Sequence, residues 1–387
     1  MTENWQIYDA LGPEIDCPGQ PLPLSAVLKQ ILNLSSSVGI KATQQYIANC
    51  ATQFLLVSNA TVTMPLTVND AQWDNCYVCS PFGAAIKYPL VELREIQSTA
   101  LRAALSALIH SVAPLLRIAR INRSICINNW MLSTNLYPDW DGSELSKLRD
   151  LLIHRYPKHA ILLRSLNAAT NEALIGQARD AGFLLAPSRQ VYISTEPEAK
   201  FLRHQNCRWD RRLLDSNEVY STVQHLEISE SDDARIKELY DMLYLEKYTS
   251  LNPQFTTKLI KLWRETQAIR LTGLRNSEGE LDGILGCFQL GGVLTAPLVG
   301  YDTSLPQDLG LYRMLMALMF KEASGQGCGL NLSSGAASFK RLRGGKPRLE
   351  YTAIYCDHLP IIQRRAWRSL AFLLARVGGP VLRKFEL

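Results

Sequence analysis

The stretch VLTAPLVGYDTSLPQDLGLYRMLMALMFKEA, residues 293–323, decides how the second half of the chain folds. Its first nine residues are largely apolar and end in Gly300 and Tyr301, which predicts a strand. A polar loop follows, and from Gly310 to about Ser324 the apolar residues recur with the period of a helix. The first N–H groups of a helix lack partners within the helix and carry partial positive charge, so this junction predicts a site for a phosphate group.

The residues around this stretch predict further elements of a mixed α/β unit. Helical periodicity precedes it, and a turn at 276–279 joins two apolar runs into a hairpin. The predicted order is helix 230–246, helix 256–264, strands 268–274, 281–290 and 293–301, helix 310–324, strand 329–332, helix 336–343 and strand 348–355.

The first half of the chain also alternates strands and helices, which is typical of α/β domains with βαβ units. Its predicted elements are helix 24–34, strands 53–58 and 60–68, helix 91–120, strand 124–136, helix 142–155, strand 159–166, helix 170–181 and strand 183–194. Within the long helix the uncharged run 103–116 is shorter than the ~20 residues that cross a membrane, so it predicts a buried helix. The two halves share an order of elements, which indicates either two related domains or two unrelated α/β segments.

Composition divides the chain into three parts. The polar, charged residues 196–218 predict a linker, so we expect domains at 1–216 and 217–357 and a separate helix within 358–387. The arginines of this linker are Arg203, Arg208, Arg211 and Arg212. They belong either to a solvated connecting helix or to a cleft for an anionic substrate.

Overall composition is that of a globular protein. The chain has 387 residues, of which 47% are hydrophobic and 20% charged, and this length suits two domains. A net charge of +5 is too small to indicate nucleic-acid binding by itself. Residues 1–5 are polar and acidic, whereas a secretory signal begins with basic and then apolar residues. Nine cysteines without a repeating spacing indicate reduced thiols, and we expect a cytoplasmic protein.

Cys76 and Cys79 form a CxxC pair. A zinc site needs a second pair or matching histidines, and the six histidines show no such spacing. The two cysteines are either structural or a metal-binding or redox pair, and we predict no metal site.

The element order of residues 230–355 resembles that of the GNAT N-acetyltransferases. These enzymes carry Gln/Arg-x-x-Gly-x-Gly/Ala between the third strand and the next helix, where this chain has Gln307-Asp-Leu-Gly-Leu-Tyr312. The resemblance implies that the pyrophosphate of coenzyme A lies at the start of this helix, with Tyr312 in place of the small residue. It also implies that strand 293–301 opens from its neighbour and binds the pantetheine arm through unpaired backbone groups. The implied donor-binding residues are Leu298, Val299, Gly300, Gln307, Leu309, Gly310, Leu311, Tyr312, Arg313 and Phe339.

A second motif, Ser338-Phe-Lys-Arg-Leu-Arg-Gly-Gly345, resembles that of the FemAB-like branch of this superfamily. The last helix of that branch carries Phe-Lys followed by an aromatic-Gly pair, and Arg343 stands where the aromatic residue would be. The resemblance implies two GNAT-like domains in tandem, the first of them degenerate, with Lys340 close to the donor. There its ammonium group could stabilise an oxyanion or a phosphate. The alternative is a basic helix that faces solvent.

Proton transfer and acceptor binding require further side chains. An amine acceptor must lose a proton, and Asp302 at the end of strand 293–301 is the nearest carboxylate, with Glu350 and His358 as weaker choices. We therefore predict Lys340 and Asp302 as catalytic residues. Polar side chains in the predicted strand 124–136 indicate either an acceptor cleft between the domains or hydrogen bonds to neighbouring backbone. The predicted acceptor-binding residues are Asn129, Trp130, Asn135 and Tyr301.

Residues 361–377 predict a basic amphipathic helix. From residue 361 to the end of the chain there are six basic side chains and one acidic side chain, Glu386. The apolar residues of the helix include Trp367, Phe372 and Leu373. Such a helix either lies on an anionic membrane surface or packs on the body of the protein.

Together these features predict an N-acyltransferase. It would move an acyl group from a thioester of coenzyme A or of an acyl carrier protein to a small amine in the cleft between the domains. The thioester is a co-substrate, and we expect no permanently bound cofactor. One alternative is transfer from an aminoacyl-tRNA, with the linker and residues 340–348 on RNA phosphates. The other is a non-catalytic adaptor that holds a protein partner or, through its tail, the inner membrane surface.

Overall fold

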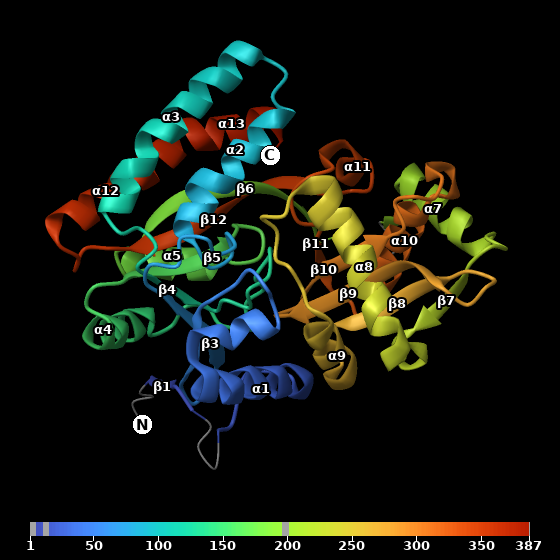
Figure 1. Ribbon diagram of the computed structural model, residues 1–387, viewed down its shortest axis with the longest axis horizontal. Coiled ribbons are helices and arrows are strands. Elements are labelled where there is room, and N and C mark those ends of the chain that lie inside the picture. The colour runs from blue at the N-terminus through green and yellow to red at the C-terminus, as the bar shows by residue number, and fades with distance from the viewer. Residues whose placement is uncertain (1–4, 11–14, 196–200, 387) are drawn as a thin grey trace.

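One mixed sheet of twelve strands runs through the computed structural model, which describes residues 5–10, 15–195 and 201–386 (Figure 1). The spatial order is β1-β2-β3-β4-β5-β12-β6-β11-β10-β9-β8-β7. The strands are β1 (Gln6–Tyr8), β2 (Gln53–Ser58), β3 (Thr63–Asn69), β4 (Ser124–Ile127), β5 (Ala160–Leu166), β6 (Leu184–Ser194), β7 (Ser221–Gln224), β8 (Arg270–Arg275), β9 (Leu281–Leu290), β10 (Val293–Tyr301), β11 (Gly329–Asn331) and β12 (Lys346–Tyr355). The predicted mixed α/β class is confirmed.

The last strand, β12, lies between β5 and β6 and connects the two halves of the chain. Ile354 pairs with Leu162 of β5 on one side and with Leu184 of β6 on the other. The far end of β6 pairs with β11, where Ile193 faces Asn331. The sheet is therefore continuous from the first half into the second, and residues from both halves meet along β6, β11 and β12.

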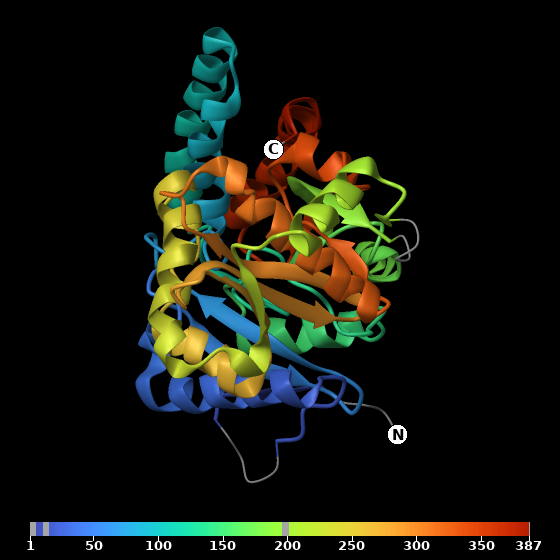
Figure 2. The ribbon, with the colours of Figure 1, turned by 90° about the vertical axis from the view of Figure 1, so that its right-hand side faces the viewer.

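Helices cover both faces of this sheet (Figures 1 and 2). The α-helices are α1 (Leu22–Val38), α2 (Tyr88–Glu92), α3 (Thr99–Ile118), α4 (Leu145–Arg155), α5 (Glu172–Asp180), α7 (Gln205–Asp215), α8 (Asp233–Asp241), α9 (Thr257–Thr266), α10 (Leu311–Gly325), α11 (Ala337–Arg341), α12 (Ile361–Leu373) and α13 (Gly379–Phe385). Short π-helical and 3-10 segments are η1 (Gly39–Lys41), η2 (Thr43–Gln45), η3 (Gly83–Lys87), η4 (Leu93–Glu95), η5 (His225–Glu227), η6 (Glu230–Asp232), η7 (Met242–Tyr248), η8 (Gln307–Leu309) and η9 (Leu374–Gly378).

Successive side chains of a strand point to opposite faces of the sheet, and each face has its own core. In the first half, Ile125 of β4 packs in the core with Leu148 of α4 and Leu174 of α5. Its neighbour Cys126 belongs to the opposite core, together with Trp367 of α12. In the second half, α8 and α9 cover one face together with α1 from the first half, while α10 covers the other face with α7 beside it.

The C-terminal helix α12 packs on the body of the protein, as one of the two interpretations predicted. Trp367 is buried against the first-half sheet with 3% of its surface exposed. Trp367 therefore does not belong to the free apolar face of the helix. That face consists of side chains such as Ile362 and Phe372, which are 65% and 63% exposed.

The apolar helix that the sequence predicts to be buried is largely exposed. The predicted helix 91–120 is interrupted before α3, and only Leu116 of α3 is buried. Leu115 and Ile118 are 62% and 73% exposed. Among the helices in the described ranges, α3 is the one long and apolar enough to span a membrane. The prediction is wrong because low charge indicates that burial of a helix is favourable but does not show that other elements of the chain cover it.

Strand β4 ends at Ile127, well before the predicted end at Leu136. Asn128 and Met131 have positive φ angles of 55° and 58°, which a strand does not accommodate. The rest of the predicted strand, residues 128–136, is a loop. Of the predicted linker, residues 196–200 lie outside the described residues, and part of the remainder forms α7.

Candidate functional site

A cavity of about 250 Å³ lies beneath the helices that cover one face of the first-half sheet. Its helical walls include Leu105, Leu108, Ile109 and Val112 of α3 and Trp367, Leu370, Leu374 and Val377 of the C-terminal segment. Its floor includes Cys126, Leu162, Ala186 and Ile354 of the sheet. We call it the apolar cavity. Such a lining suits a hydrocarbon chain, because burying its methylene groups removes them from water.

Polar side chains gather at one end of the floor, where the strands beside β12 are irregular. The register shifts against β5 between Tyr351 and Ala353, and against β6 between Glu350 and Tyr351. Ser165 in the first irregularity has a φ of 64°, which is strained for a residue with a side chain. Bulges of this kind redirect side chains and are frequent beside active sites. The polar residues that line this end are Arg164, Ser165, Ser188, Arg189 and Glu350.

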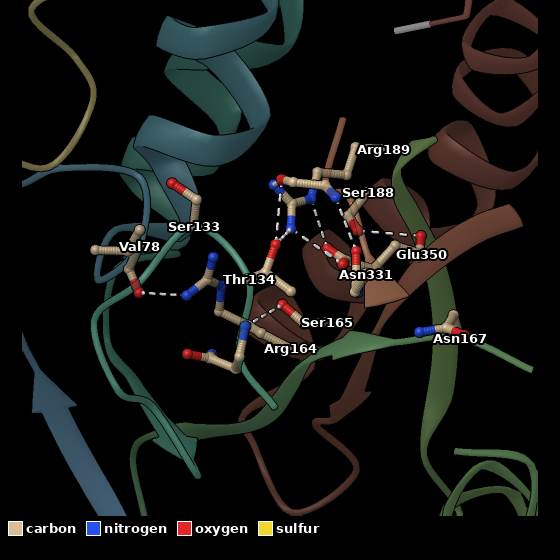
Figure 3. A network of polar contacts seen from close by, with 12 residues as sticks. Val78, Ser133, Thr134, Arg164, Ser165, Asn167, Ser188, Arg189, Asn331 and Glu350 are labelled. Atoms are coloured by element: carbon tan, nitrogen blue, oxygen red, sulfur yellow. Dashed lines mark hydrogen bonds and ion pairs between the residues drawn. The ribbon is translucent and has the colours of Figure 1, made fainter. Parts of the chain in front are cut away.

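Arg189 and Glu350 form a buried ion pair between β6 and β12. The guanidinium donates from Nε to Oε1 at 2.7 Å and from Nη2 to Oε2 at 3.0 Å (Figure 3). It also donates to the hydroxyls of Thr134 at 2.7 Å and Ser333 at 3.3 Å. Burial opposes the charge, but the Glu350 carboxylate outweighs it and raises the pKa of Arg189 above its ordinary value. This pair fixes the polar end of the cavity.

Arg164 presents a second guanidinium to the cavity. Its Nη1 donates to the carbonyl oxygen of Val78 at 3.0 Å and to Oδ1 of Asn129 at 3.2 Å. No carboxylate in the described ranges lies within ion-pair distance of it. A positive charge bound only by neutral oxygens can attract a carbonyl oxygen that becomes negative during a reaction.

Lys340 is buried and does not face solvent, although a solvent-facing helix was the alternative. Its Nζ donates to the carbonyl oxygen of Ser334 at 2.6 Å and to that of Ser333 at 3.3 Å. Ser334 lines the apolar cavity. Burial, reinforced by the charge of Arg189, lowers the pKa of Lys340 to about 7. The amine can therefore accept or release a proton near neutral pH.

Replacing Lys340 with methionine is expected to stabilise the protein at neutral pH. The unfolded lysine has a pKa of 10.5, so between pH 7 and 10 it holds a proton that the folded lysine lacks. The free energy of unfolding of the unaltered protein should then rise by up to about 1.4 kcal/mol per pH unit in this window. Urea denaturation at pH 7 and pH 9 measures this. The free energy of unfolding of Lys340→Met should exceed that of the unaltered protein by more at pH 7 than at pH 9. A gain that is equal at both pH values would show an ordinary lysine.

Glu92 at the end of α2 brings a carboxylate to the wall of the apolar cavity. No hydrogen bond or ion pair within the described ranges holds it. Burial raises the pKa of Glu92 to about 7, although the charge of Arg189 opposes this. Tyr77 lines the wall nearby and donates to Oγ of Ser133 at 2.7 Å. Glu92 is therefore a second group that can exchange a proton near neutral pH.

A second cavity of about 190 Å³ also reaches Ser165 and is lined largely by polar side chains. We call it the polar cavity. Its residues come from both halves of the chain, and Asn331 and Gly291 belong to the second half. Its acidic and amide residues include Asn135, Asp139, Asp141, Asn167 and Glu172. Asn135, predicted to bind the acceptor, lines this cavity, whereas Asn129 contacts Arg164 beside the apolar cavity.

The predicted donor loop lies away from both cavities. Gly310 has a φ of 69°, and a Cβ added there would lie 2.6 Å from Cδ2 of Leu213 in α7. Arg313 donates from Nε to Oδ1 of Asp210 at 2.7 Å, and Arg343 contacts the same carboxylate. Helix α7 therefore occupies the approach to Gly310, and Asp210 takes up the nearby positive charges. Pyrophosphate binding by Gln307, Leu309, Gly310, Leu311 and Arg313 stays a prediction.

Strand β10 pairs with β11 only from Val293 to Thr295, and no strand of the described residues pairs with its later residues on that side. These include Leu298, Val299 and Gly300, the implied contacts of the pantetheine arm. Tyr312 lies between Tyr301 and Phe339, with ring centroids 6.2 and 5.0 Å away. The three rings form one packed cluster, and their donor or acceptor contacts also stay predictions.

Two other predicted site residues have structural partners. Arg235 forms an ion pair with Asp302 at 2.7 Å. Burial raises the pKa of Asp302, but its contacts with Ser304 and Arg235 outweigh burial and lower the pKa below its ordinary value. Asp302 is therefore a weak proton acceptor. Trp130 stacks at a tilt on Phe288, with ring centroids 5.3 Å apart, and donates to Asn128. Neither residue lines the apolar or the polar cavity.

The sequence contained a signal for the residues that were missed. Arg164 and Arg189 are single charges inside the apolar strands AILLRSL and LLAPSRQVYIS. A charge in such a strand needs a partner or a ligand. All nine cysteines, Cys76 and Cys79 included, are free and buried. Within the described ranges no group of His, Cys, Asp and Glu side chains could hold a metal ion.

Comparisons show a general likeness of chain path to known proteins. No family model and no curated protein matches the sequence. L-PGS from Bacillus licheniformis is 12% identical over 64% of this chain and 82% of its own, with a TM-score of 0.44. FemX is 10% identical over 59% and 80%, with a TM-score of 0.43. A tandem GNAT protein from the clavulanic acid biosynthesis pathway is 10% identical over 92% and 99%, with a TM-score of 0.40. Identities of 10–12% and TM-scores below 0.5 show nothing of the activity of this chain.

Proposed function

We propose that the protein is an N-acyltransferase that holds an acyl chain in the apolar cavity and receives an amine through the polar cavity. The observation that carries this proposal is Ser165, which lines both cavities. A transfer between an apolar donor and a polar acceptor needs a place where the two substrates meet in a fixed orientation.

The reacting carbonyl would lie at the polar end of the apolar cavity, close to Arg164. Attack by the amine turns the thioester carbonyl into a tetrahedral oxyanion, and the Arg164 guanidinium stabilises that charge. The C–N bond forms in this attack, and the C–S bond breaks when the oxyanion collapses back to a carbonyl and expels the thiolate. The Arg189–Glu350 pair keeps the surrounding strands in register. Because Glu350 is paired with Arg189, it does not neutralise the charge of Arg164.

The proton of the amine needs an acceptor, and we assign this role to Glu92. Its carboxylate lines the cavity and has a pKa of about 7, so its basic form is populated at neutral pH. The proton then passes to the departing thiolate, which leaves as a thiol. Lys340 donates to the backbone carbonyl oxygen of Ser334, which lines the cavity, so protonation of Lys340 changes the charge next to the cavity wall.

A basic surface on and beside α7 supports aminoacyl-tRNA as a second candidate donor. Arg203, Arg208, Arg211 and Arg212 are all exposed there. Lys340 is buried and would not contact RNA phosphates. If the donor is an aminoacyl-tRNA, activity should fall steeply as salt rises, because phosphate contacts release counterions.

A chain-length series tests the proposal. The purified protein is incubated with acetyl-, octanoyl- or dodecanoyl-coenzyme A and a panel of primary amines, and thiol release and acylated products are measured. Each methylene buried in the cavity should raise kcat/KM roughly fourfold, the equivalent of about 0.8 kcal/mol, until the cavity is filled. An acetyl group that reacts as well as dodecanoyl, or aminoacyl-tRNA consumed in place of every thioester, would contradict the proposal.

A further inference from the structure

Helix α3 is an apolar element that the described residues cover on one side only. Arg102 and Arg117 are its only charged residues, apart from the titratable His110. Helices of this composition in soluble proteins are normally buried, and an exposed apolar surface marks a contact with another apolar phase. Figure 2 shows α3 projecting from the body of the molecule.

The C-terminal segment α12–α13 continues this surface and adds positive charge. It lies on the same side of the molecule as α3 (Figure 1). Its exposed apolar residues are Ile361, Ile362 and Phe372, at 48%, 65% and 63%. Its basic residues are Arg364, Arg365, Arg368, Arg376, Arg383 and Lys384. The one acidic residue, Glu386, is paired with Arg341.

The same two segments enclose the apolar cavity. Val112 of α3 and Leu370 of α12 face the cavity, whereas Ile118 and Phe372 of these helices face outward. A surface that carries apolar and basic groups therefore covers the cavity in which the proposed acyl chain lies.

The charge of this surface decides between two partners that could cover it, a second copy of the chain and a membrane. Arg368 is paired with Asp357. If a second copy of the chain covered the surface symmetrically, the other five basic side chains would face five others, and like charges repel. An anionic bilayer offers hydrocarbon for α3 and phosphate groups for the arginines. A bilayer matches both features.

We infer that α3 and α12–α13 dock the protein on an anionic membrane surface, and that the hydrocarbon-bearing substrate enters the apolar cavity from the bilayer between these helices. The second part rests on the proposed function. The first part depends only on the exposed residues. The substrate class is thus a long-chain acyl thioester that partitions into the bilayer.

Vesicle sedimentation tests the docking surface with the full-length protein. Two variants remove its features: Leu115→Glu with Ile118→Glu on α3, and Arg365→Glu with Arg376→Glu and Arg383→Glu on the tail. Two matched controls change other exposed positions: Leu226→Glu with Val219→Glu in the second half, and Lys41→Glu with Arg155→Glu and Lys158→Glu away from α3. Circular dichroism checks that each variant is folded.

The unaltered protein should sediment with vesicles that contain phosphatidylglycerol and much less with pure phosphatidylcholine. Each surface variant should bind at least tenfold more weakly, while both controls bind normally. Absence of vesicle binding, equal losses in the controls, or conversion of a dimer into a monomer by the α3 variant would overturn the inference. Normal docking with no effect of chain length on transfer would leave the surface standing and remove the proposed reaction.

Discussion

Replacing Glu350 with alanine is expected to lower the free energy of unfolding by about 3–5 kcal/mol, the range measured when one partner of a buried ion pair is removed. The side chains of Glu350 and Arg189 are 3% and 14% exposed. The alanine would leave the Arg189 guanidinium in a site that water hardly reaches, with only the hydroxyls of Thr134 and Ser333 to bind it. Urea denaturation of the folded variant, or its loss of soluble expression, measures the effect.

Two controls separate the ion pair from the mere loss of a side chain. The double variant Glu350→Ala with Arg189→Met should recover part of the lost stability, because it removes the uncompensated charge. Glu230→Ala breaks the exposed contact with Lys261 and should cost about 1 kcal/mol or less. If Glu350→Ala is as mild as Glu230→Ala, the pair does not hold the polar end of the cavity together.

The local elements of the second half could be predicted from the sequence. The predicted strands 281–290 and 293–301 have the same bounds as β9 and β10. Their apolar runs are separated by Gly291 and Gly292, both with positive φ, so turn and strands are encoded by neighbouring residues.

The position of β12 could not be predicted in this way. Its residues form a strand wherever they pair, and nothing local specifies β5 and β6 as partners. That pairing brings Glu350 to Arg189 and places the irregularities at Ser165 beside them. Glu350 entered the sequence prediction only as a weak choice of base, because its partner lies 161 positions away in the chain.

The apolar cavity escaped prediction for a related reason. Its walls come from α3 and from the C-terminal helices, which meet only in the folded protein. The apolar residues of α3 indicated a helix that avoids water, and a buried position was the ordinary interpretation. Lys340 was found through a family resemblance, but its burial and lowered pKa follow from contacts with residues 333–334 that only the fold creates.

Filling the apolar cavity should weaken the binding of long acyl chains and leave that of short ones unaffected. Val112 lines the cavity from α3, and its replacement by tryptophan puts an indole where the chain would lie. Excluding four methylene groups costs about 3 kcal/mol, which corresponds to a loss of roughly 10²-fold in affinity. Ala104 lies on the exposed side of the same helix, so Ala104→Trp adds the same side chain without entering the cavity.

The most direct measurement is the affinity of dodecanoyl- and acetyl-coenzyme A for the two tryptophan variants and the unaltered protein by isothermal titration calorimetry. It requires no knowledge of the acceptor. We expect the unaltered protein and Ala104→Trp to bind dodecanoyl-coenzyme A at least 10²-fold more tightly than acetyl-coenzyme A, and Val112→Trp to lose that preference. A Val112→Trp protein that keeps the full preference for the long chain would contradict the assignment of the cavity as the acyl-chain site.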